Sequence, residues 1–257
     1  MIPKVIHYCW FGGNPLPEEA KKCIASWKKF LPDYVIKEWN ESNFDVNAIP
    51  YTKEAYEAKK WAFVSDYVRF RVLYNYGGLY FDTDVEVIKP IDDIIARGNF
   101  MGYECPSEVG ATPRDVAPGL GLGVNPGLGL GVNPGLDLIK SILEEYDNNH
   151  FLVEGVPQTN KTVVNYTTEE FNKIGKSQYS DKVDYSEGVY LYYPEYFCPL
   201  NHHTGKLTIT ENTRTIHHYT ATWKSSSQKR KAALIRILGP KLTDFLVKVK
   251  HCLQKPK

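Results

Sequence analysis

The sequence predicts an α/β fold, in which a mixed sheet is flanked by helices. A chain of 257 residues suits one α/β domain, or one such domain with a helical addition. Residues 5–39 follow the order strand, helix, strand at the spacing of a βαβ unit, whose two strands are parallel. Residues 52–76 then show helical spacing of apolar positions and lead through two glycines into an aromatic strand. We assign this domain to residues 1–223.

The first βαβ unit is bounded by turn residues. A strand over residues 5–10 ends before Gly12-Gly13, and a second strand covers residues 34–39. Between them a helix begins near Pro17, has two glutamates in its first turn and ends before Pro32. The end of the first strand therefore lies where open α/β sheets bind their ligands.

The next helical stretch has a plausible N-cap at Thr52 and is expected to break near Trp61. Its apolar positions recur at helical spacing: Trp61, Val64, Val68, Val72 and Tyr76. Gly77 suits a left-handed C-terminal cap. The strand that follows is expected to carry the aspartates Asp82 and Asp84 and to continue through residues 85–88 to Pro90.

The remainder of the chain has weaker patterns and one repeat. The octapeptide Gly-Leu-Gly-Leu-Gly-Val-Asn-Pro occurs twice in tandem, at 119–126 and 127–134. We interpret it as a duplication within one glycine-rich strand and loop, because an eight-residue insert in a surface loop costs little free energy. A helix is predicted over 136–146, and strands are predicted at 190–194 and 213–219.

Charge is concentrated at the carboxyl-terminal end. Residues 224–257 hold eight Lys and two Arg against one Asp, so they carry a net charge of +9 and the rest of the chain carries −8. Residues 229–253 form a basic amphipathic helical stretch, which either packs on the domain or lies on an anionic membrane surface. The overall charge of +1 gives no reason to expect nucleic-acid binding.

The cysteines and the first residues indicate a reducing compartment. The five cysteines are scattered without a Cys-x-x-Cys motif, so buried free thiols are favoured over disulfides or a zinc site. Residues 2–8 read as a strand rather than a signal peptide, and no apolar run approaches the ~20 residues of a membrane span. We expect a cytoplasmic protein, which the basic tail could bring to the inner face of the cell membrane.

The Asp82-Thr83-Asp84 segment is the most informative candidate site. Carboxylates at i and i+2 of an extended chain project to the same side. Two such acids can hold Mg²⁺ or Mn²⁺ together with water and substrate phosphates. Solvated turns also produce this pattern by chance, but the preceding Leu79-Tyr80-Phe81 favours a strand end in the body of the fold.

Three other groups could complete the site. Asp66 and Arg69 are either an ordinary helical ion pair or contacts for sugar hydroxyls and phosphate. Trp10 either stacks on a base or packs in the core. His217 and His218 point to opposite sides of an extended chain, so only one of them can face the acids. We take His218 as the metal ligand, with His217 as the alternative.

Four motifs together resemble bacterial capsular-polysaccharide-type glycosyltransferases of family 32, the proteins with a DXD sugar-binding motif. The motifs are Ile-His-Tyr-Cys-Trp-Phe-Gly-Gly at 6–13, Ser65-Asp66-x-x-Arg69, Tyr76-Gly-Gly-x-Tyr80-x-Asp82-x-Asp84 and Ile216-His-His-Tyr-x-x-x-Trp223. The group is distantly similar to yeast initiating mannosyltransferases and to the glucosylating domains of large clostridial toxins. The resemblance covers roughly residues 1–223, and the ordered set is more specific than any single motif.

The resemblance implies a GT-A type fold, a nucleotide-diphosphate sugar as donor, with a UDP-sugar favoured, and retention of anomeric configuration. It assigns Mn²⁺ or Mg²⁺ to Asp82 and Asp84. The donor-binding residues that it implies are Trp10, Asp66, Arg69, Tyr80 and Trp223, and the catalytic set is Asp66, Arg69, Asp82 and Asp84. The relatives carry one glycine-rich pass beside the donor sugar, where this chain has the doubled octapeptide.

The predicted function is therefore a metal-dependent, retaining hexosyltransferase. It would move a hexose to a glycan or lipid-linked saccharide acceptor in surface or capsular polysaccharide synthesis. Two alternatives stay open at this point. One is a metal-dependent nucleotidyltransferase or phosphohydrolase that uses the same acids. The other is an inactive sugar-nucleotide binding module.

Overall fold

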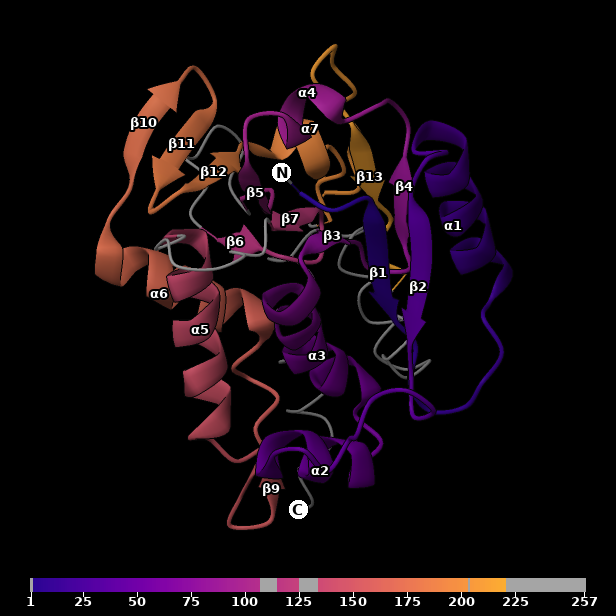
Figure 1. Cartoon of the computed structure of the whole chain (residues 1–257), viewed down its shortest axis with the longest axis vertical. Coiled ribbons are helices and arrows are strands. Elements are labelled where there is room, and N and C mark those ends of the chain that lie inside the picture. The colour runs from indigo at the N-terminus through magenta and orange to yellow at the C-terminus, as the bar shows by residue number, and fades with distance from the viewer. Residues whose placement is uncertain (1, 107–114, 125–133, 203, 221–257) are drawn as a thin grey trace, which may run out of the picture.

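The computed structural model describes residues 2–106, 115–124, 134–202 and 204–220, and it confirms the predicted mixed α/β sheet flanked by helices (Figure 1). The main sheet has nine strands: β1 (Val5–Cys9), β2 (Val35–Trp39), β3 (Gly78–Tyr80), β5 (Asn99–Tyr103), β6 (Val116–Ala117), β7 (Leu122–Val124), β10 (Ser177–Ser180), β11 (Val183–Ser186) and β12 (Val189–Tyr192). Eight of them lie in the order β10-β11-β12-β5-β7-β3-β1-β2, and β6 pairs with β5.

Two short strand pairs and seven helices complete the described residues. The pairs are β4 (Val85–Val87) with β13 (Thr215–His217), and β8 (Leu152–Val153) with β9 (Val156–Pro157). The helices are α1 (Glu18–Phe30), α2 (Pro50–Glu57), α3 (Trp61–Tyr76), α4 (Asp92–Ile95), α5 (Pro134–Asp147), α6 (Val163–Ile174) and α7 (Pro194–Phe197). No helix within these ranges is long and apolar enough to cross a membrane.

The predicted βαβ unit is confirmed. β1 pairs in parallel with β2, and α1 connects them. Helix α1 buries Trp27, whose indole N–H donates a hydrogen bond to the carbonyl of Val85, 2.7 Å away. Figure 1 shows α1 beside β2 and β4, which places this helix on one side of the sheet.

The predicted break between the next two helices is also confirmed. Helix α2 ends at Glu57 and α3 begins at Trp61, and Lys59 between them has a positive φ of 57°. Helix α3 ends at Tyr76 and is capped by Gly77, which has φ 63° and donates its backbone N–H to the carbonyl of Leu73. Gly78 comes next, and a Cβ there would lie 2.6 Å from the Val5 carbonyl, so a glycine is needed for β3 to pack against β1.

The prediction of one continuous acidic strand is wrong. Strand β3 ends at Tyr80, and a turn follows in which the N–H of Val85 bonds the Asp82 carbonyl at 3.0 Å. The chain then enters β4, which leaves the main sheet because it pairs antiparallel with β13. Asp82 and Asp84 therefore flank a turn and are not neighbours on one face of a strand.

The two faces of the sheet have separate apolar cores. Side chains of α2, α3, α5 and α6 cover one face, and side chains of α1, β4, α4 and α7 cover the other. Strand β3 contributes to both cores because its side chains alternate: Tyr80 enters the first core, whereas Leu79 and Phe81 enter the second.

The second half of the chain differs most from the sequence-based expectations. Helix α5 and strands β12 and β13 confirm the predicted elements near 136–146, 190–194 and 213–219. Strand β5, helix α6 and the hairpin β10-β11 were not predicted. The second octapeptide copy lies almost entirely outside the described residues, and Trp223, the linker 225–227 and the basic stretch 229–253 lie wholly outside them.

Candidate functional site

The candidate site begins where the parallel strands β1 and β3 end. Their pairing brings the residues that follow them to the same edge of the sheet. Trp10 follows β1 directly; it is half-buried, packs against the second core, and donates its indole N–H to the carbonyl of Asn14 at 2.6 Å. The structure therefore places Trp10 at the predicted edge with part of its ring exposed.

On the α3 side of this edge, one arginine holds two carboxylates. A terminal nitrogen of Arg69 lies 2.8 Å from Asp66 and 3.3 Å from Asp82. Its Nε donates to the carbonyl of Ser65 at 3.3 Å. The side chain of Arg69 is 5% exposed and that of Asp66 is 10% exposed, so this ion pair is nearly cut off from water.

Burial and charge act in opposite directions on this pair. Burial raises the pKa of Asp66 to about 6, although the guanidinium of Arg69 opposes the shift. Burial alone would lower the pKa of Arg69, but the surrounding negative groups, led by Asp82, outweigh it and raise the pKa. Arg69 thus stays charged and fixes Asp82, whose side chain is 29% exposed and faces outward from this buried group.

Tyr80 contacts both the Asp82 carboxylate and the guanidinium of Arg69. Its ring lies under the guanidinium of Arg69, with 4.8 Å between the guanidinium carbon and the ring centroid. Its hydroxyl donates to Asp82 at 3.2 Å. Tyr80 is 1% exposed and so does not offer a surface to a ligand. It acts on the site by holding the Asp82 carboxylate through its hydroxyl.

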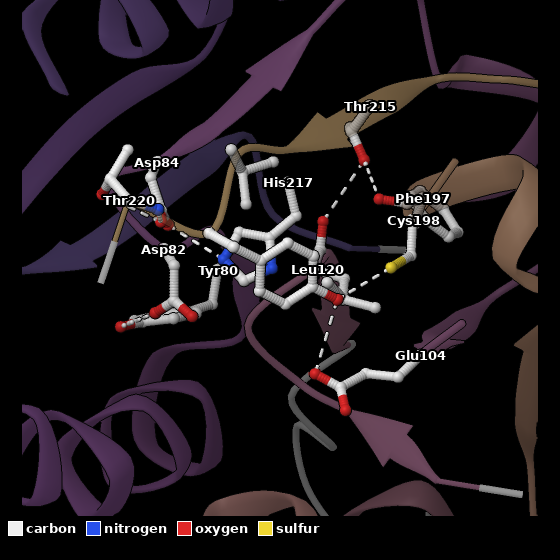
Figure 2. A network of polar contacts seen from close by, with 12 residues as sticks. Tyr80, Asp82, Asp84, Glu104, Leu120, Phe197, Cys198, Thr215, His217 and Thr220 are labelled. Atoms are coloured by element: carbon white, nitrogen blue, oxygen red, sulfur yellow. Dashed lines mark hydrogen bonds and ion pairs between the residues drawn. The ribbon is translucent and has the colours of Figure 1, made fainter. Parts of the chain in front are cut away.

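The other carboxylate, Asp84, is held by residues from the far end of the described chain. Nε2 of His217 lies 2.9 Å from Asp84, and the backbone N–H and the hydroxyl of Thr220 donate to it at 2.8 and 3.1 Å. Figure 2 shows His217 and Thr220 on either side of this carboxylate. Burial opposes ionisation of Asp84, but His217 and Thr220 outweigh it and lower the pKa of Asp84 to about 2.

The choice between the two neighbouring histidines is reversed by the structure. His217 is the last residue of β13 and faces Asp84, whereas His218 points away and contacts Glu86 at 2.9 Å in an exposed position. The expectation that His218 faces the aspartates is therefore wrong. The physical reason is the register of β13 on β4, in which His217 lies opposite Val85, directly after Asp84.

Several residues of the site were not singled out from the sequence. Thr220 binds Asp84 directly, and Tyr219 supports His217 with its ring centroid 4.0 Å away. The hydroxyl of Tyr219 meets the Cys198 thiol at 2.9 Å and Glu104 at 3.5 Å. The motif Ile-His-His-Tyr gave a signal for Tyr219, but nothing in the sequence pointed to Glu104 or Cys198.

The first octapeptide copy forms part of the site. Strand β7 lies between β3 and β5, and the carbonyl of Gly119 accepts the backbone N–H of Asp82 at 3.0 Å. A Cβ on Gly119 would lie 1.9 Å from Oδ2 of Asp82. Farther along, a Cβ on Gly123 would lie 2.3 Å from the ring of Phe100. These glycines let the strand approach both the carboxylate and the core.

The residues present fit a divalent metal that a substrate also helps to bind. Among the residues that the structure describes, no three His, Cys, Asp or Glu side chains gather into a ready metal cage. Asp82 and Asp84 nevertheless offer two partly exposed carboxylates on one turn, which suits Mg²⁺ or Mn²⁺ when phosphate oxygens and water supply the other ligands. Nδ1 of His217 is buried without a hydrogen-bond partner in the described part of the chain, so its polar capacity is not fully used.

The sequence matches a known family over about a third of its length. Residues 17–101 match the family model of the glycosyltransferase sugar-binding region containing the DXD motif. This range includes Asp66, Arg69, Asp82 and Asp84, and it leaves out Trp10 and everything after Met101.

Individual relatives are similar over a comparable part of the chain. Inositol phosphoceramide mannosyltransferase 3 of Schizosaccharomyces pombe is 29% identical over 112 residues, which are 42% of this chain and 31% of the yeast protein. The uncharacterized glycosyltransferase L373 of Acanthamoeba polyphaga mimivirus is 30% identical over 107 residues, 39% of this chain and 43% of the viral protein. The chain thus spans less than half the length of these curated relatives.

The fold also resembles a solved structure at low similarity. The PaToxG glycosyltransferase superposes with a TM-score of 0.45 and 19% identity, over 67% of this chain and 69% of that one. The family match and the curated relatives together support a glycosyltransferase.

Proposed function

We propose that this protein is a metal-dependent glycosyltransferase that transfers a hexose from a nucleotide-diphosphate sugar. The observation that carries the proposal is the acidic turn between β3 and β4. Its two aspartates are fixed from opposite sides, Asp82 by Arg69 and Asp84 by His217 and Thr220. This turn lies within the part of the chain that matches the DXD sugar-binding region.

The residues of the chain divide the work at the site. Asp82 and Asp84 would hold Mg²⁺ or Mn²⁺, which would supply positive charge to neutralise the diphosphate leaving group. Arg69 adds a permanent positive charge behind Asp82, and we assign to the half-buried Trp10 the role of stacking on the base of the donor. His217 orients Asp84 and keeps it ionised. Asp66 keeps Arg69 in place through their ion pair, and its contact with the donor stays a prediction.

The finer details of the proposal come from the motif resemblance and the relatives. We infer a GT-A type fold, retention of anomeric configuration, a UDP-sugar as donor, and a role in surface or capsular polysaccharide synthesis. The yeast relative and the viral relative both have glycosyltransferase names, and the name of the yeast protein describes transfer of mannose to a lipid. A lipid-linked saccharide as acceptor would agree with a basic tail at 229–253 that binds an anionic membrane surface, and Trp223 remains a proposed diphosphate contact.

The test is release of nucleoside diphosphate from a panel of nucleotide sugars in the presence of Mn²⁺. Asp82→Asn and Asp84→Asn keep the shape of each side chain but remove its charge, so each should lower turnover by roughly 100-fold or more. Glu86→Gln is the matched control, because Glu86 is exposed on the next strand and contacts only His218 among the site residues.

Three results would contradict the proposal. Turnover by the wild type that is unchanged by EDTA would exclude the metal. Release of pyrophosphate or inorganic phosphate instead of nucleoside diphosphate would indicate a nucleotidyltransferase or a phosphohydrolase. Donor binding without any release would indicate an inactive binding module.

A further inference from the structure

Two thiols meet directly behind the His217 side of the site. Cys105 follows β5 by two residues, and Cys198 follows α7. The thiol of Cys105 donates to the backbone carbonyl of Cys198 at 3.2 Å, and the two thiols are close enough for each to shift the pKa of the other. Both are free in the structure, although 93 positions separate them in the sequence. The fold therefore brings this pair together from a position after a strand and a position after a helix.

The two thiols have different environments. Cys105 is partly exposed, and its hydrogen bond with Cys198 lowers the pKa of its thiol. Cys198 is 0% exposed. The buried Cys9 and Cys23 lie elsewhere, and burial raises the pKa of each to about 12. An accessible thiol of lowered pKa beside a second thiol is the arrangement in which oxidation produces a disulfide.

The buried thiol is linked to the proposed donor site through one tyrosine. The Cys198 sulfur lies 2.9 Å from the hydroxyl of Tyr219. The ring of Tyr219 packs on His217, and the backbone of Tyr219 has a positive φ of 51°, which is uncommon for a residue with a side chain. The next residue, Thr220, binds Asp84. Figure 2 shows Cys198 pointing into the network that holds Glu104 and His217.

We propose that Cys105 and Cys198 form a reversible disulfide under peroxide, and that this disulfide loosens the hold of Tyr219 on His217 and Thr220. The Cys105 thiolate attacks one peroxide oxygen, the O–O bond breaks and a sulfenic acid forms, and the departing hydroxide takes up the proton that the thiol released and becomes water. The Cys198 sulfur then attacks the sulfenic sulfur and a second water leaves, so two thiols and one hydrogen peroxide give one disulfide and two waters.

The consequence for the site follows from the geometry. A Cys198 sulfur bonded to Cys105 turns away from Tyr219, whose hydroxyl keeps only the longer contact to Glu104 at 3.5 Å. The support of His217 and Thr220 on Asp84 then weakens. This second step rests on the proposed function, because it concerns the metal-binding carboxylate, whereas formation of the disulfide does not.

The first measurement is independent of any enzymatic activity. The full chain is reduced, exposed to hydrogen peroxide, blocked with an alkylating reagent and mapped by mass spectrometry without reduction. We expect a Cys105–Cys198 disulfide that dithiothreitol reverses, with Cys9 and Cys23 still alkylated after unfolding. Formation of a different disulfide, for example one with Cys252, or oxidation of Cys105 to sulfonic acid without a disulfide, would overturn the proposal.

The second measurement uses Mn²⁺ alone as the probe, with its binding followed by electron paramagnetic resonance. Oxidation should weaken Mn²⁺ binding by roughly 10-fold, the usual effect of losing a residue that supports a metal ligand. Cys105→Ser should bind Mn²⁺ like the reduced wild type and should not respond to peroxide. A disulfide that leaves Mn²⁺ binding unchanged would overturn the link through Tyr219. Absence of Mn²⁺ binding in the reduced protein would instead count against the proposed function, and the disulfide map would still decide the first step.

Discussion

The two aspartates of the acidic turn lie two positions apart, yet the fold supports them in different ways. Asp82 is held by Arg69 on the preceding helix, and both residues belong to one local stretch of chain. Asp84 is held by His217 and Thr220, which lie 133 and 136 positions farther along. The first half of the site is thus built by one helix and one strand, whereas the second half exists only when the whole domain has folded.

The electrostatics of the two halves differ in the same way. Next to Asp82, burial dominates and raises the pKa of Asp66 to about 6. On the other side, the partners of Asp84 outweigh burial and lower its pKa to about 2. The Arg69 half therefore carries an electrostatic cost of burial, whereas in the His217 half the partners of Asp84 keep it ionised although its side chain is only 17% exposed. One turn thus joins a carboxylate supported by a buried ion pair to a carboxylate kept ionised by a histidine and a threonine.

The largest effect on stability is expected from removing the buried arginine that supports Asp82. Arg69→Leu leaves Asp66 and Asp82 without their buried partner, so the free energy of unfolding should fall by about 3–5 kcal/mol. Urea unfolding measures this loss. Lys140→Leu is the control, because its ion pair with Glu144 on α5 is exposed and is worth at most about 1 kcal/mol. Equal losses of unfolding free energy in the two variants would show that the ion pairs of Arg69 contribute no more than an exposed ion pair.

The pH dependence of stability should separate the two carboxylates. The ordinary pKa of Asp is 3.8, so the cost of burying ionised Asp66 is present above pH 6 and is relieved as the pH falls from about 6 to 3.8. Relative to Asp66→Asn, the wild type should gain up to about 3 kcal/mol over that range. The stabilisation from Asp84 is present above pH 3.8 and is lost as the pH falls towards 2, by about 2 kcal/mol relative to Asp84→Asn.

Denaturant unfolding at a series of pH values, in EDTA, checks both parts. The two difference curves should slope in opposite directions over adjacent pH ranges. A curve for Asp66→Asn that runs parallel to the wild type between pH 7 and 4 would show that burial does not dominate at Asp66.

A substitution at His217 should change the affinity for metal more than the stability of the protein. His217→Ala removes the group that orients Asp84, and Mn²⁺ binding should weaken by roughly 10- to 100-fold while the protein stays folded. His218→Ala is the matched control, since the neighbouring ring contacts the exposed Glu86 instead. Titration with Mn²⁺ distinguishes them. Loss of affinity in His218→Ala alone would reverse the assignment of the two histidines.

The smallest effect is expected from removing one octapeptide. Deletion of residues 127–134 leaves the same Asn-Pro pair before Gly135, and the first copy already supplies β7 and its contact with Asp82. The link between β7 and α5 shortens from residues 125–133 to Asn125 alone, so the free energy of unfolding should change by no more than about 2 kcal/mol, the closure entropy of the shortened link. Thermal unfolding with Mn²⁺ titration provides the measurement, and turnover should be equal or better.

A point substitution in the first copy gives the contrast. Gly119→Ala places a Cβ against Oδ2 of Asp82, so it should weaken Mn²⁺ binding although it changes one small residue. A deletion that unfolds the protein would show that both copies belong to the core.

The sequence could predict the local half of the site because its signals are short in range. Helical spacing placed Asp66 and Arg69 on neighbouring faces of α3, and two glycines marked the entry to β3. Strand β4 was wrongly joined to β3 because Val85-Glu86-Val87 has strand character and nothing local shows that its partner is β13. Alternation along a strand showed that His217 and His218 face opposite ways, but only the register on β4 decides which of them meets Asp84.

The elements that were not predicted depend on distant partners. Strand β5 pairs with β12 and β7, which lie far from it in sequence, and it contains an Asn and a Gly that weaken a strand pattern. Helix α6 begins with Thr162 and Asn165 in a reciprocal capping arrangement, a signal that was present and not used. Glu104 and Cys198 gain their place near His217 only through the order of strands in the sheet.

The contact between Thr220 and Asp84 also limits the distance between the site and any surface to which the basic stretch 229–253 binds. Eight residues, 221–228, separate Thr220 from the basic stretch 229–253. Whatever conformation they adopt, nine Cα–Cα steps span at most about 30 Å. If the basic stretch were bound to an anionic bilayer, Thr220 would therefore lie within about 30 Å of that stretch. The Asp84 carboxylate could then reach only sugars that a lipid carrier presents within about that distance of the bilayer surface, roughly the thickness of the hydrocarbon core itself.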